Sequence, residues 1–187
     1  MVETMFDGKD LHAEVEVSFS EVMQEGGTTK TIKILREDIC GSCNGTREKE
    51  GSQSMTCYSC GGTGVKEDPL FHKETKCNTC KGHGKLVQNK CGNCSGTGLV
   101  MKEETIELSI DRYTGDGDIL EMPLQGHRTL YPARGKNGTL KVVVMVNAEL
   151  SRWRNGLNVH SNHFISLSDA LKGCKVHIDT VHGEQEI

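Results

Sequence analysis

The stretch CGNCSGTG, residues 91–98, decides the fold of this chain because it is one of four copies of the same short unit. Two cysteines stand three positions apart, and two glycines follow at fixed offsets. The unit recurs as CYSCGGTG at 57–64 and as CNTCKGHG at 77–84. A fourth copy, CGSCNGTR at 40–47, keeps the pattern except that Arg47 replaces the last glycine. One structural requirement must account for all four copies.

An ordinary hydrophobic core cannot hold residues 40–98 together. This segment contains eight of the nine cysteines and eleven of the 22 glycines, but only seven large apolar residues. Ordering one residue costs about 1–2 kcal/mol of conformational entropy, and seven apolar side chains cannot offset that cost over the whole segment. Another source of stability is therefore required.

Tetrahedral zinc is the source that the cysteine spacing favours. Two Cys-x-x-Cys turns supply the four thiolates of one structural zinc site, so four turns predict two Zn²⁺ ions, each held by four cysteines. Glycines permit tight turns with positive φ that direct backbone amides toward the sulfurs. A structural zinc site contributes an apparent ~10–16 kcal/mol in finger peptides at neutral pH, which is the kind of stabilisation that this segment needs.

Other cysteine chemistry fits the pattern less well. Disulfide frameworks are typical of secreted chains, and the N-terminal MVETMFDGKDLH contains no secretory signal. A redox Cys-x-x-Cys is normally single and lies at a helix N-terminus, and iron–sulfur clusters use other spacings. Cys174 has no Cys-x-x-Cys partner and is expected to be buried, and His83 is expected to serve its turn rather than to bind metal.

The flanking strands indicate how the four turns pair. A strand over 28–39 leads into the segment, and a strand over 101–110 leads out of it. If both belong to one sheet, Cys40 and Cys94 lie close together, and the first turn pairs with the fourth. This nested arrangement gives one zinc the ligands Cys40, Cys43, Cys91 and Cys94, and gives the other Cys57, Cys60, Cys77 and Cys80. Spacing alone also allows sequential pairing, the first turn with the second and the third with the fourth.

The rest of the sequence predicts a mainly β fold. Apolar and polar residues alternate in LHAEVEVSF at 11–19, which is typical of a half-buried strand. Ser20 is expected to cap a short helix that Gly26 ends. TIELSI at 105–110 alternates in the same way, and the continuous apolar run LKVVVMV at 140–146 predicts a strand that is buried on both faces.

A second β domain is expected to begin near residue 149. Its segment HFISLSDALKG predicts a strand and then a short helix, with Ser168 as N-cap and Gly173 at the end. The predicted domains are a discontinuous first β domain at 1–39 and 99–148, an inserted cysteine-rich module at 40–98, and the incomplete beginning of a second β domain at 149–187.

Charge and hydropathy disfavour several classes of partner. The chain has 22 basic and 26 acidic residues, which argues against binding to nucleic acid or to an anionic membrane. No stretch approaches the roughly 20 apolar residues of a membrane span. The chain is therefore expected to be intracellular, and its abrupt end at VHGEQEI suggests a piece of a longer protein.

Four such repeats inserted into a β domain resemble the zinc-containing DnaJ chaperones, also called type I J-domain proteins. GKDLHAEVEVSFSEVMQEG is similar to the opening of that family's first client-binding β domain, and NGLNVHSNHFISLSDALKG is similar to the opening of its second. The resemblance implies nested zinc pairing. It also implies a non-enzymatic co-chaperone that binds non-native polypeptide and presents it to a DnaK-type ATP-driven chaperone, with a structural zinc module that is needed for transfer.

The resemblance also implies where clients bind. In that family an apolar groove beside a strand edge accepts an extended client segment as an added strand. The equivalent positions in this chain are Leu11, Ile32, Ile34, Ile106 and Leu108. Alternating apolar residues on strands also form ordinary cores, so the alternative that these side chains are core stays open.

The chain departs from the family pattern in several places. It contains no J-domain with a His-Pro-Asp tripeptide, and the resemblance implies that one lies upstream. The family's dimerisation segment is also missing, so the full-length protein is expected to dimerise and this chain to be monomeric. A Gly-Glu-Gly turn is absent at LQGHRTLYP, which together with VHSNHFIS favours organellar over cytosolic members.

Two functions from other classes stay open at this point. Thiol–disulfide exchange through a Cys-x-x-Cys pair without zinc would need an exposed thiolate of low pKa. Zinc-dependent nucleic-acid binding would show salt-sensitive affinity, and the acidic balance of the chain disfavours it.

Overall fold

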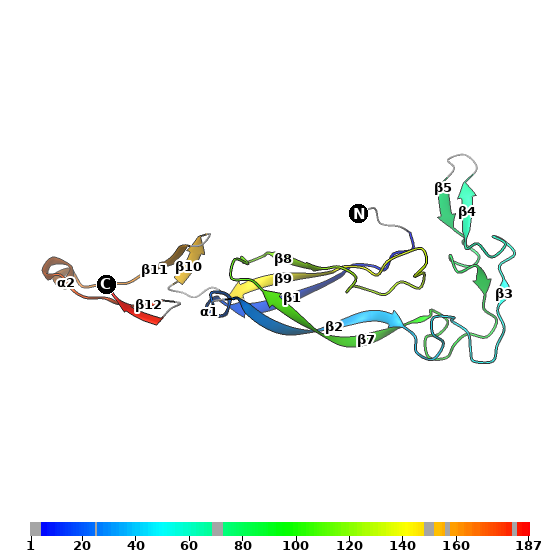
Figure 1. Cartoon of the computed structure of the whole chain (residues 1–187), viewed down its shortest axis with the longest axis horizontal. Helices are drawn as coiled ribbons and strands as arrows, with labels where there is room; N and C mark the ends of the chain where they lie inside the picture. Colours follow the sequence, from blue (N-terminus) through cyan, green and yellow to red (C-terminus); the bar gives the residue numbers. More distant parts are fainter. Residues whose placement is uncertain (1–4, 25, 69–72, 148–151, 156–157, 181–182) are drawn as a thin grey trace. The chain divides into compact units, whose positions relative to one another are not determined.

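The computed structural model describes residues 5–24, 26–68, 73–147, 152–155, 158–180 and 183–187, and it confirms the predicted mainly β fold (Figure 1). The described helices are four and six residues long. Neither has the length that a membrane-spanning helix needs.

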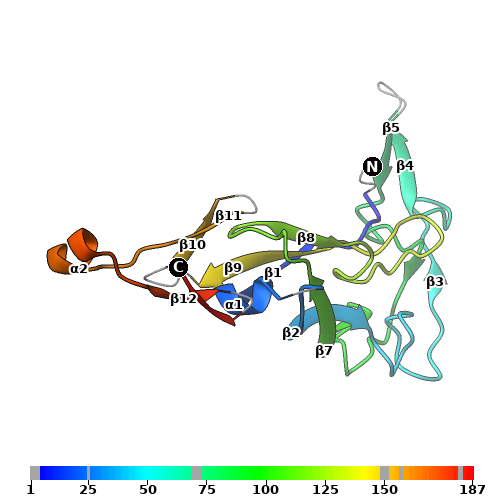
Figure 2. The same ribbon diagram turned by 60° about the vertical axis from the view of Figure 1, so that its left-hand side comes forward.

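Long strands make up the part of the fold that flanks the cysteine-rich module, residues 40–98. One sheet has the strand order β1-β9-β8, and a second consists of β2 and β7. Figures 1 and 2 both show β2 and β7 side by side, with the module continuing from their ends. The strands are β1 (Leu11–Ser18), β2 (Thr28–Ile39), β7 (Leu99–Ile110), β8 (Ile119–Met122) and β9 (Leu140–Asn147).

The strands described within the cysteine-rich module are short, at two to four residues each. β3 (Met55–Thr56) pairs with β6 (Lys85–Leu86), and β4 (Val65–Asp68) pairs with β5 (Lys73–Lys76), both antiparallel. An isolated bridge joins Glu48 to Lys90. The chain therefore passes outward along β3 and β4 and returns along β5 and β6, so segments far apart in sequence become neighbours.

The C-terminal residues form two further antiparallel hairpins and a helix. β10 (Arg152–Asn155) pairs with β11 (Asn158–Ser161), and β12 (His177–Thr180) pairs with β13 (Gly183–Glu186). Helix α2 (Leu167–Lys172) lies between the two hairpins in the sequence. The predicted strand at HFIS is wrong, because residues 162–166 are irregular and lead directly into the helix cap.

The chain divides into two compact units. One comprises Met1–Leu11, Ile34–Glu104 and Glu121–Lys141, and the other comprises His12–Lys33, Thr105–Leu120 and Val142–Ile187. The first unit contains the whole cysteine-rich module and the loop that connects β8 to β9, so both candidate metal centres belong to it.

The prediction that residues 140–146 are buried on both faces is wrong. Along β9, Leu140, Val142 and Val144 are fully buried, whereas the alternate residues are half-buried and Met145 is exposed. A sheet that is covered on one side buries every second side chain. A continuous apolar run does not by itself show that both faces are covered.

Both predicted helix caps lie two residues too late, for the same reason. Helix α1 (Phe19–Val22) is capped by Ser18 rather than Ser20, and helix α2 by Ser166 rather than Ser168. Each true cap has an acidic residue three positions later, Glu21 or Asp169, whose backbone N–H donates to the serine hydroxyl. This spacing is that of a capping box, and it selects the first serine in both SFSE and SLSD. Gly173 ends α2 as predicted.

Candidate metal centres

The structure gathers eight cysteines into two four-membered clusters. The first, which we call the base cluster, lies where β2 ends and β7 begins and comprises Cys40, Cys43, Cys91 and Cys94. The second, the tip cluster, lies farther along the module and comprises Cys57, Cys60, Cys77 and Cys80. In each cluster all four sulfurs lie within 4.8 Å of one another. The first turn therefore meets the fourth, and the second meets the third.

The sulfur distances suit a tetrahedral metal ion. The Sγ atoms of Cys43 and Cys94 are 3.7 Å apart, and those of Cys40 and Cys91 are 4.0 Å apart. The corresponding tip-cluster distances are 3.7 and 3.9 Å. Four sulfurs at about 2.3 Å from a tetrahedral zinc lie about 3.8 Å from one another, whereas a disulfide needs about 2.05 Å. The donor set and its spacing thus fit Zn²⁺.

Reciprocal backbone bonds pair the two turns of each cluster. The N–H of Cys40 donates to the carbonyl of Gly98, and that of Cys91 donates to the carbonyl of Arg47, both at 2.9 Å. In the tip cluster Cys57 donates to Gly84 and Cys77 to Gly64, again at 2.9 Å. The first cysteine of each repeat therefore bonds the last residue of the partner repeat. Because every repeat is eight residues long, the same pair of backbone hydrogen bonds forms in both clusters.

The last residue of each repeat also donates to sulfur. The N–H groups of Gly64, Gly84 and Gly98 each lie 3.2 Å from the second cysteine sulfur of their own repeat. Such donors stabilise thiolate, the form that binds metal. The turn requires positive φ at this position, and the three glycines supply it at 77°, 72° and 84°. This requirement is the physical reason for the repeated glycine.

The thiol pKa values differ within each cluster because hydrogen bonds lower some of them and burial raises others. A hydrogen bond from the Asn93 amide lowers the pKa of Cys40 to about 6. The backbone N–H of Cys80 lowers the pKa of Cys77 to about 6. Burial raises the pKa of Cys43 and of Cys57 to about 11. Each cluster therefore contains one thiol whose pKa is lowered and another whose pKa is raised.

Two residues break the repeat pattern, and the structure brings them to the same place. Arg47 replaces the last glycine of the first repeat and keeps positive φ, at 71°. His83 stands in the third repeat where the others have Thr46, Thr63 and Thr97. Those threonine hydroxyls donate to the carbonyl of the second cysteine at 2.7–2.8 Å. His83 instead lies beside Tyr131 from the β8–β9 loop, with 3.1 Å between Nε2 and the phenol oxygen.

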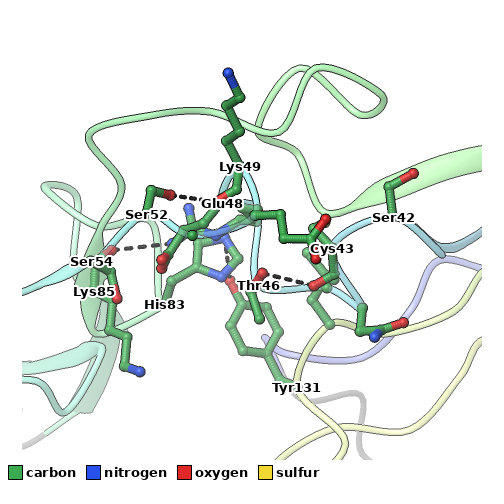
Figure 3. A pocket seen from close by; sticks show the side chains of 16 residues that line it. Ser42, Cys43, Thr46, Glu48, Lys49, Ser52, Ser54, His83, Lys85 and Tyr131 are labelled. Atoms are coloured by element: carbon green, nitrogen blue, oxygen red, sulfur yellow. Dashed lines mark hydrogen bonds between the residues drawn. The ribbon is translucent and has the colours of Figure 1, made fainter.

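A pocket of about 570 Å³ opens beside this contact (Figure 3). His83, Tyr131 and Lys85 line it together with residues 42–52 and Ser54. Burial, followed by the nearby charge of Arg47, lowers the pKa of His83 to about 4, so the imidazole is neutral near pH 7. The sequence marked Arg47 as a departure from the repeat and predicted that His83 serves its turn, but it did not place the two residues at one pocket.

The five residues predicted to bind clients differ in exposure. Ile34, Ile106 and Leu108 are buried, with exposed fractions of 4%, 8% and 2%, whereas Leu11 and Ile32 are half-buried. The apolar side chains that β2 and β7 expose most are others, Leu35 at 56%, Met101 at 54% and Ile39 at 42%. Leu35 is exposed because it alternates with the buried Ile34 and Arg36 of the same strand.

The expectation that Cys174 is buried is wrong. The side chain is exposed in the segment between α2 and β12. The neighbouring residues of α2 are also exposed, so this part of the chain provides no interior in which the thiol could be buried.

Comparison with known proteins gives one consistent family. The family described as DnaJ C terminal domain matches residues 6–187. The chain is 34% identical over 183 residues to the chaperone protein DnaJ of Lachnospira eligens, covering 95% of this chain and 48% of that protein. It is 33% identical to that of Bacillus velezensis and 31% identical to that of Pediococcus pentosaceus, covering 96% of this chain in both cases and 48% and 49% of those proteins. The chain spans about half the length of the curated relatives it matches.

Proposed function

The chain belongs to the DnaJ C-terminal domain family, and from this premise we propose that it binds non-native polypeptide segments and passes them to a DnaK-type ATP-driven chaperone. The observation that supports this proposal most directly is the pair of four-cysteine clusters in the module between β2 and β7, in a chain that the family matches from residue 6 to its end.

In this proposal the base cluster and the tip cluster each hold one Zn²⁺. The ion supplies four metal–sulfur bonds, and the residues of the chain supply the geometry. The paired turns bring the sulfurs together, and the backbone N–H groups of Gly64, Gly84 and Gly98 stabilise sulfur negative charge. The role of these ions is structural, because four thiolates complete a tetrahedral site and leave no position for substrate.

Client segments in this proposal bind apolar side chains on the long strands. Strand addition uses backbone hydrogen bonds for affinity and side-chain pockets for preference, so it tolerates many client sequences. Leu11 and Ile32, which are half-buried, keep surface for such contacts. We add Leu35, Ile39 and Met101 as client contacts, because they are the most exposed apolar side chains of β2 and β7.

Suppression of aggregation tests the proposal. A denatured client is diluted into buffer with the chain, in its zinc-loaded form or after treatment with a strong chelator. We expect the zinc-loaded chain to slow aggregation, and a DnaK-type chaperone with ATP to accelerate release of a bound fluorescent apolar peptide. A chain that slows aggregation no more than an inert protein of the same size would refute client binding.

Thiol–disulfide exchange is the alternative, and zinc and thiol titrations separate the two. Seven of the eight cluster cysteines are buried, and Cys60 is half-buried. Zinc at two ions per chain, with none of the cluster thiols reactive in the native protein, would exclude the redox role. Reactive cluster thiols with catalysis of disulfide exchange would support it.

A further inference from the structure

We propose that Tyr131, His83 and Arg47 form a clasp that fixes the position of the cysteine-rich module against the β8–β9 loop, residues 123–139. The functional consequence rests on the function proposed above: a module in a fixed position presents the bound client to the DnaK-type chaperone. The clasp itself is a physical contact that can be tested without any client.

Tyr131 provides the attachment on the loop side. Its hydroxyl donates to the backbone carbonyl of Lys81 at 2.9 Å and lies 3.1 Å from His83 Nε2. Its ring stacks on His83 with 5.0 Å between centroids and meets the buried Phe6 edge-on at 4.9 Å. The ammonium of Lys76 lies 5.6 Å from the same ring. Three residues of the module therefore contact one side chain of the loop.

The hydrogen bonds assign the tautomer of His83. A phenol has one proton, and Tyr131 donates it to the Lys81 carbonyl, which can only accept. The proton between the phenol oxygen and Nε2 therefore belongs to His83. The neutral imidazole thus donates to the loop, which a threonine at this position would not have the length to do.

Arg47 ties the two clusters of the module to each other. Its Nη2 donates to the carbonyl of Lys85 at 3.1 Å, across 38 positions of sequence, and its own carbonyl accepts from Cys91 of the base cluster. Lys85 follows immediately after the third repeat, which carries His83. The chain Cys91–Arg47–Lys85 therefore connects the base cluster to the turn that Tyr131 holds.

Close packing at Gly82 shows that the module lies tightly against Phe6 and Tyr131. A Cβ atom added there would lie 3.2 Å from both Phe6 Cε1 and the Tyr131 hydroxyl oxygen. Both departures from the repeat, Arg47 and His83, line the same pocket as Tyr131 of the loop. Turn geometry requires neither residue. At the position of Arg47 the other three repeats form the turn with glycine, and at the position of His83 the other three form it with threonine.

The pocket beside the clasp does not indicate a particular ligand. Arg47, Lys49 and Lys85 line it together with Glu48 and Glu50, and this mixture of charges selects no single class of ligand. The clasp residues form part of its wall (Figure 3), which is consistent with a pocket that results from docking of the loop.

The test measures the distance between the module and the rest of its unit. Spin labels carried by non-natural amino acids, which avoid thiol chemistry, are placed at the exposed positions Lys66 in β4 and Lys9 before β1. We expect one narrow distance distribution in the parent chain. His83→Thr and Tyr131→Ala should broaden it, while zinc stays at two ions per chain because the repeats themselves are intact.

A graded series of variants separates the contribution of the Tyr131 hydroxyl from that of its ring. Tyr131→Phe keeps the ring contacts and loses both hydrogen bonds of the hydroxyl, so the ratio of docked to undocked module should fall about tenfold, equivalent to ~1.4 kcal/mol. Arg47→Gly restores the repeat and should also broaden the distribution. Tyr58→Phe is the matched control, because Tyr58 is 82% exposed and its variant should match the parent.

The functional arm compares peptide affinity with peptide transfer. We expect the clasp variants to bind a fluorescent apolar peptide as the parent does, but to release it more slowly to a DnaK-type chaperone with ATP. Unchanged distances in His83→Thr and Tyr131→Ala, or loss of zinc from them, would overturn the clasp. Broadened distances with unchanged transfer would overturn its link to transfer. A parent chain that transfers nothing would count against the proposed function, and the distances would still decide the clasp.

Discussion

Ile34 and Leu35 are neighbours on β2 and illustrate how one strand can supply both core and surface. Ile34 is 4% exposed and Leu35 is 56% exposed. A strand directs successive side chains to opposite faces, so the apolar residue that the pattern marks as inward is already covered by the fold. Client binding needs apolar surface that the fold leaves uncovered, and on this strand Leu35 provides more of it than Ile34 does.

A pair of alanine variants tests this division. We expect Ile34→Ala to lower the free energy of unfolding by about 2–5 kcal/mol, the usual cost of truncating a buried isoleucine, and to leave peptide affinity unchanged among folded molecules. Leu35→Ala should change stability little and weaken binding of a Leu-rich heptapeptide about tenfold, or ~1.4 kcal/mol. Thermal unfolding and peptide titration measure the two effects. The reverse result would place Ile34 in the client groove, as the sequence predicted.

Residue patterns predicted the clusters better than they predicted single contacts. Cys-x-x-Cys spacing and the flanking strands favoured the nested grouping over the sequential one, because the turn geometry is local and pairing of the two strands would bring their ends together. The contact between His83 and Tyr131 joins positions 48 apart, and no local pattern encodes it. Burial of Cys174 failed as a prediction because the side-chain type says nothing about whether neighbouring elements cover it.

At the scale of elements, helix α1 shows how a helix of four residues can be held by its cap. Ser18 and Glu21 satisfy each other's backbone donors, and Lys30 from β2 bonds the Glu21 carboxylate at 2.6 Å. A helix this short gains almost nothing from propagation. Its stability therefore depends on the cap and on the buried side chains of Phe19 and Val22.

Because of this cap, the free energy of unfolding should depend on pH in the acidic range. The hydrogen bond from Lys30, followed by that from the Ser18 backbone, lowers the pKa of Glu21 from 4.5 to about 2. Because the folded-state pKa lies below the unfolded one, the contribution is complete above pH 4.5 and is lost as the pH falls through about 2. We expect Glu21→Gln to destabilise the chain near neutral pH and to match the parent below pH 2.

Chemical denaturation across this pH range measures the effect, with Glu16→Gln as control, because Glu16 is an exposed glutamate of β1. A constant difference between Glu21→Gln and the parent at every pH would show that the carboxylate charge contributes nothing and that only the side-chain shape matters.

The paired turns of the two clusters occupy different places among the elements. Cys40 and Cys94 lie beside the ends of β2 and β7, and Cys40 also bonds the backbone at Gly98. Cys57 and Cys77 join only short strands of the module. Loss of metal at the base should therefore reach the long strands, whereas loss at the tip should not.

Single serine variants test that difference. We expect Cys40→Ser to lose one zinc and to increase hydrogen exchange in residues 34–39 and 99–104. Cys60→Ser should lose one zinc and leave those amides protected. Zinc analysis and hydrogen exchange on both variants make the comparison, and exposure of residues 99–104 in Cys60→Ser would contradict it.

At the scale of the whole chain, the kind of side chain that is buried differs between two regions. Among the described residues, every buried apolar side chain of the cysteine-rich module is a cysteine. Outside the module the buried apolar side chains are aliphatic and aromatic core residues such as Val17, Leu140 and Val142. Metal should therefore stabilise one region and apolar burial the other, even though a single covalent chain passes through both.

Removal of metal should separate these two regions. A chelator strong enough to extract thiolate-bound zinc should abolish protection at the amides of Cys57, Cys77 and Cys91, whose bonds join paired turns. The amide of Val144, which donates to the Asp118 carbonyl at 2.9 Å, should keep its protection, because Leu140, Val142 and Val144 belong to the apolar core outside the module. Hydrogen exchange before and after chelation, followed by return of zinc, measures both. Simultaneous loss at Cys91 and Val144 would mean that the core depends on the module, since apolar burial alone would then be insufficient to hold β9 in place.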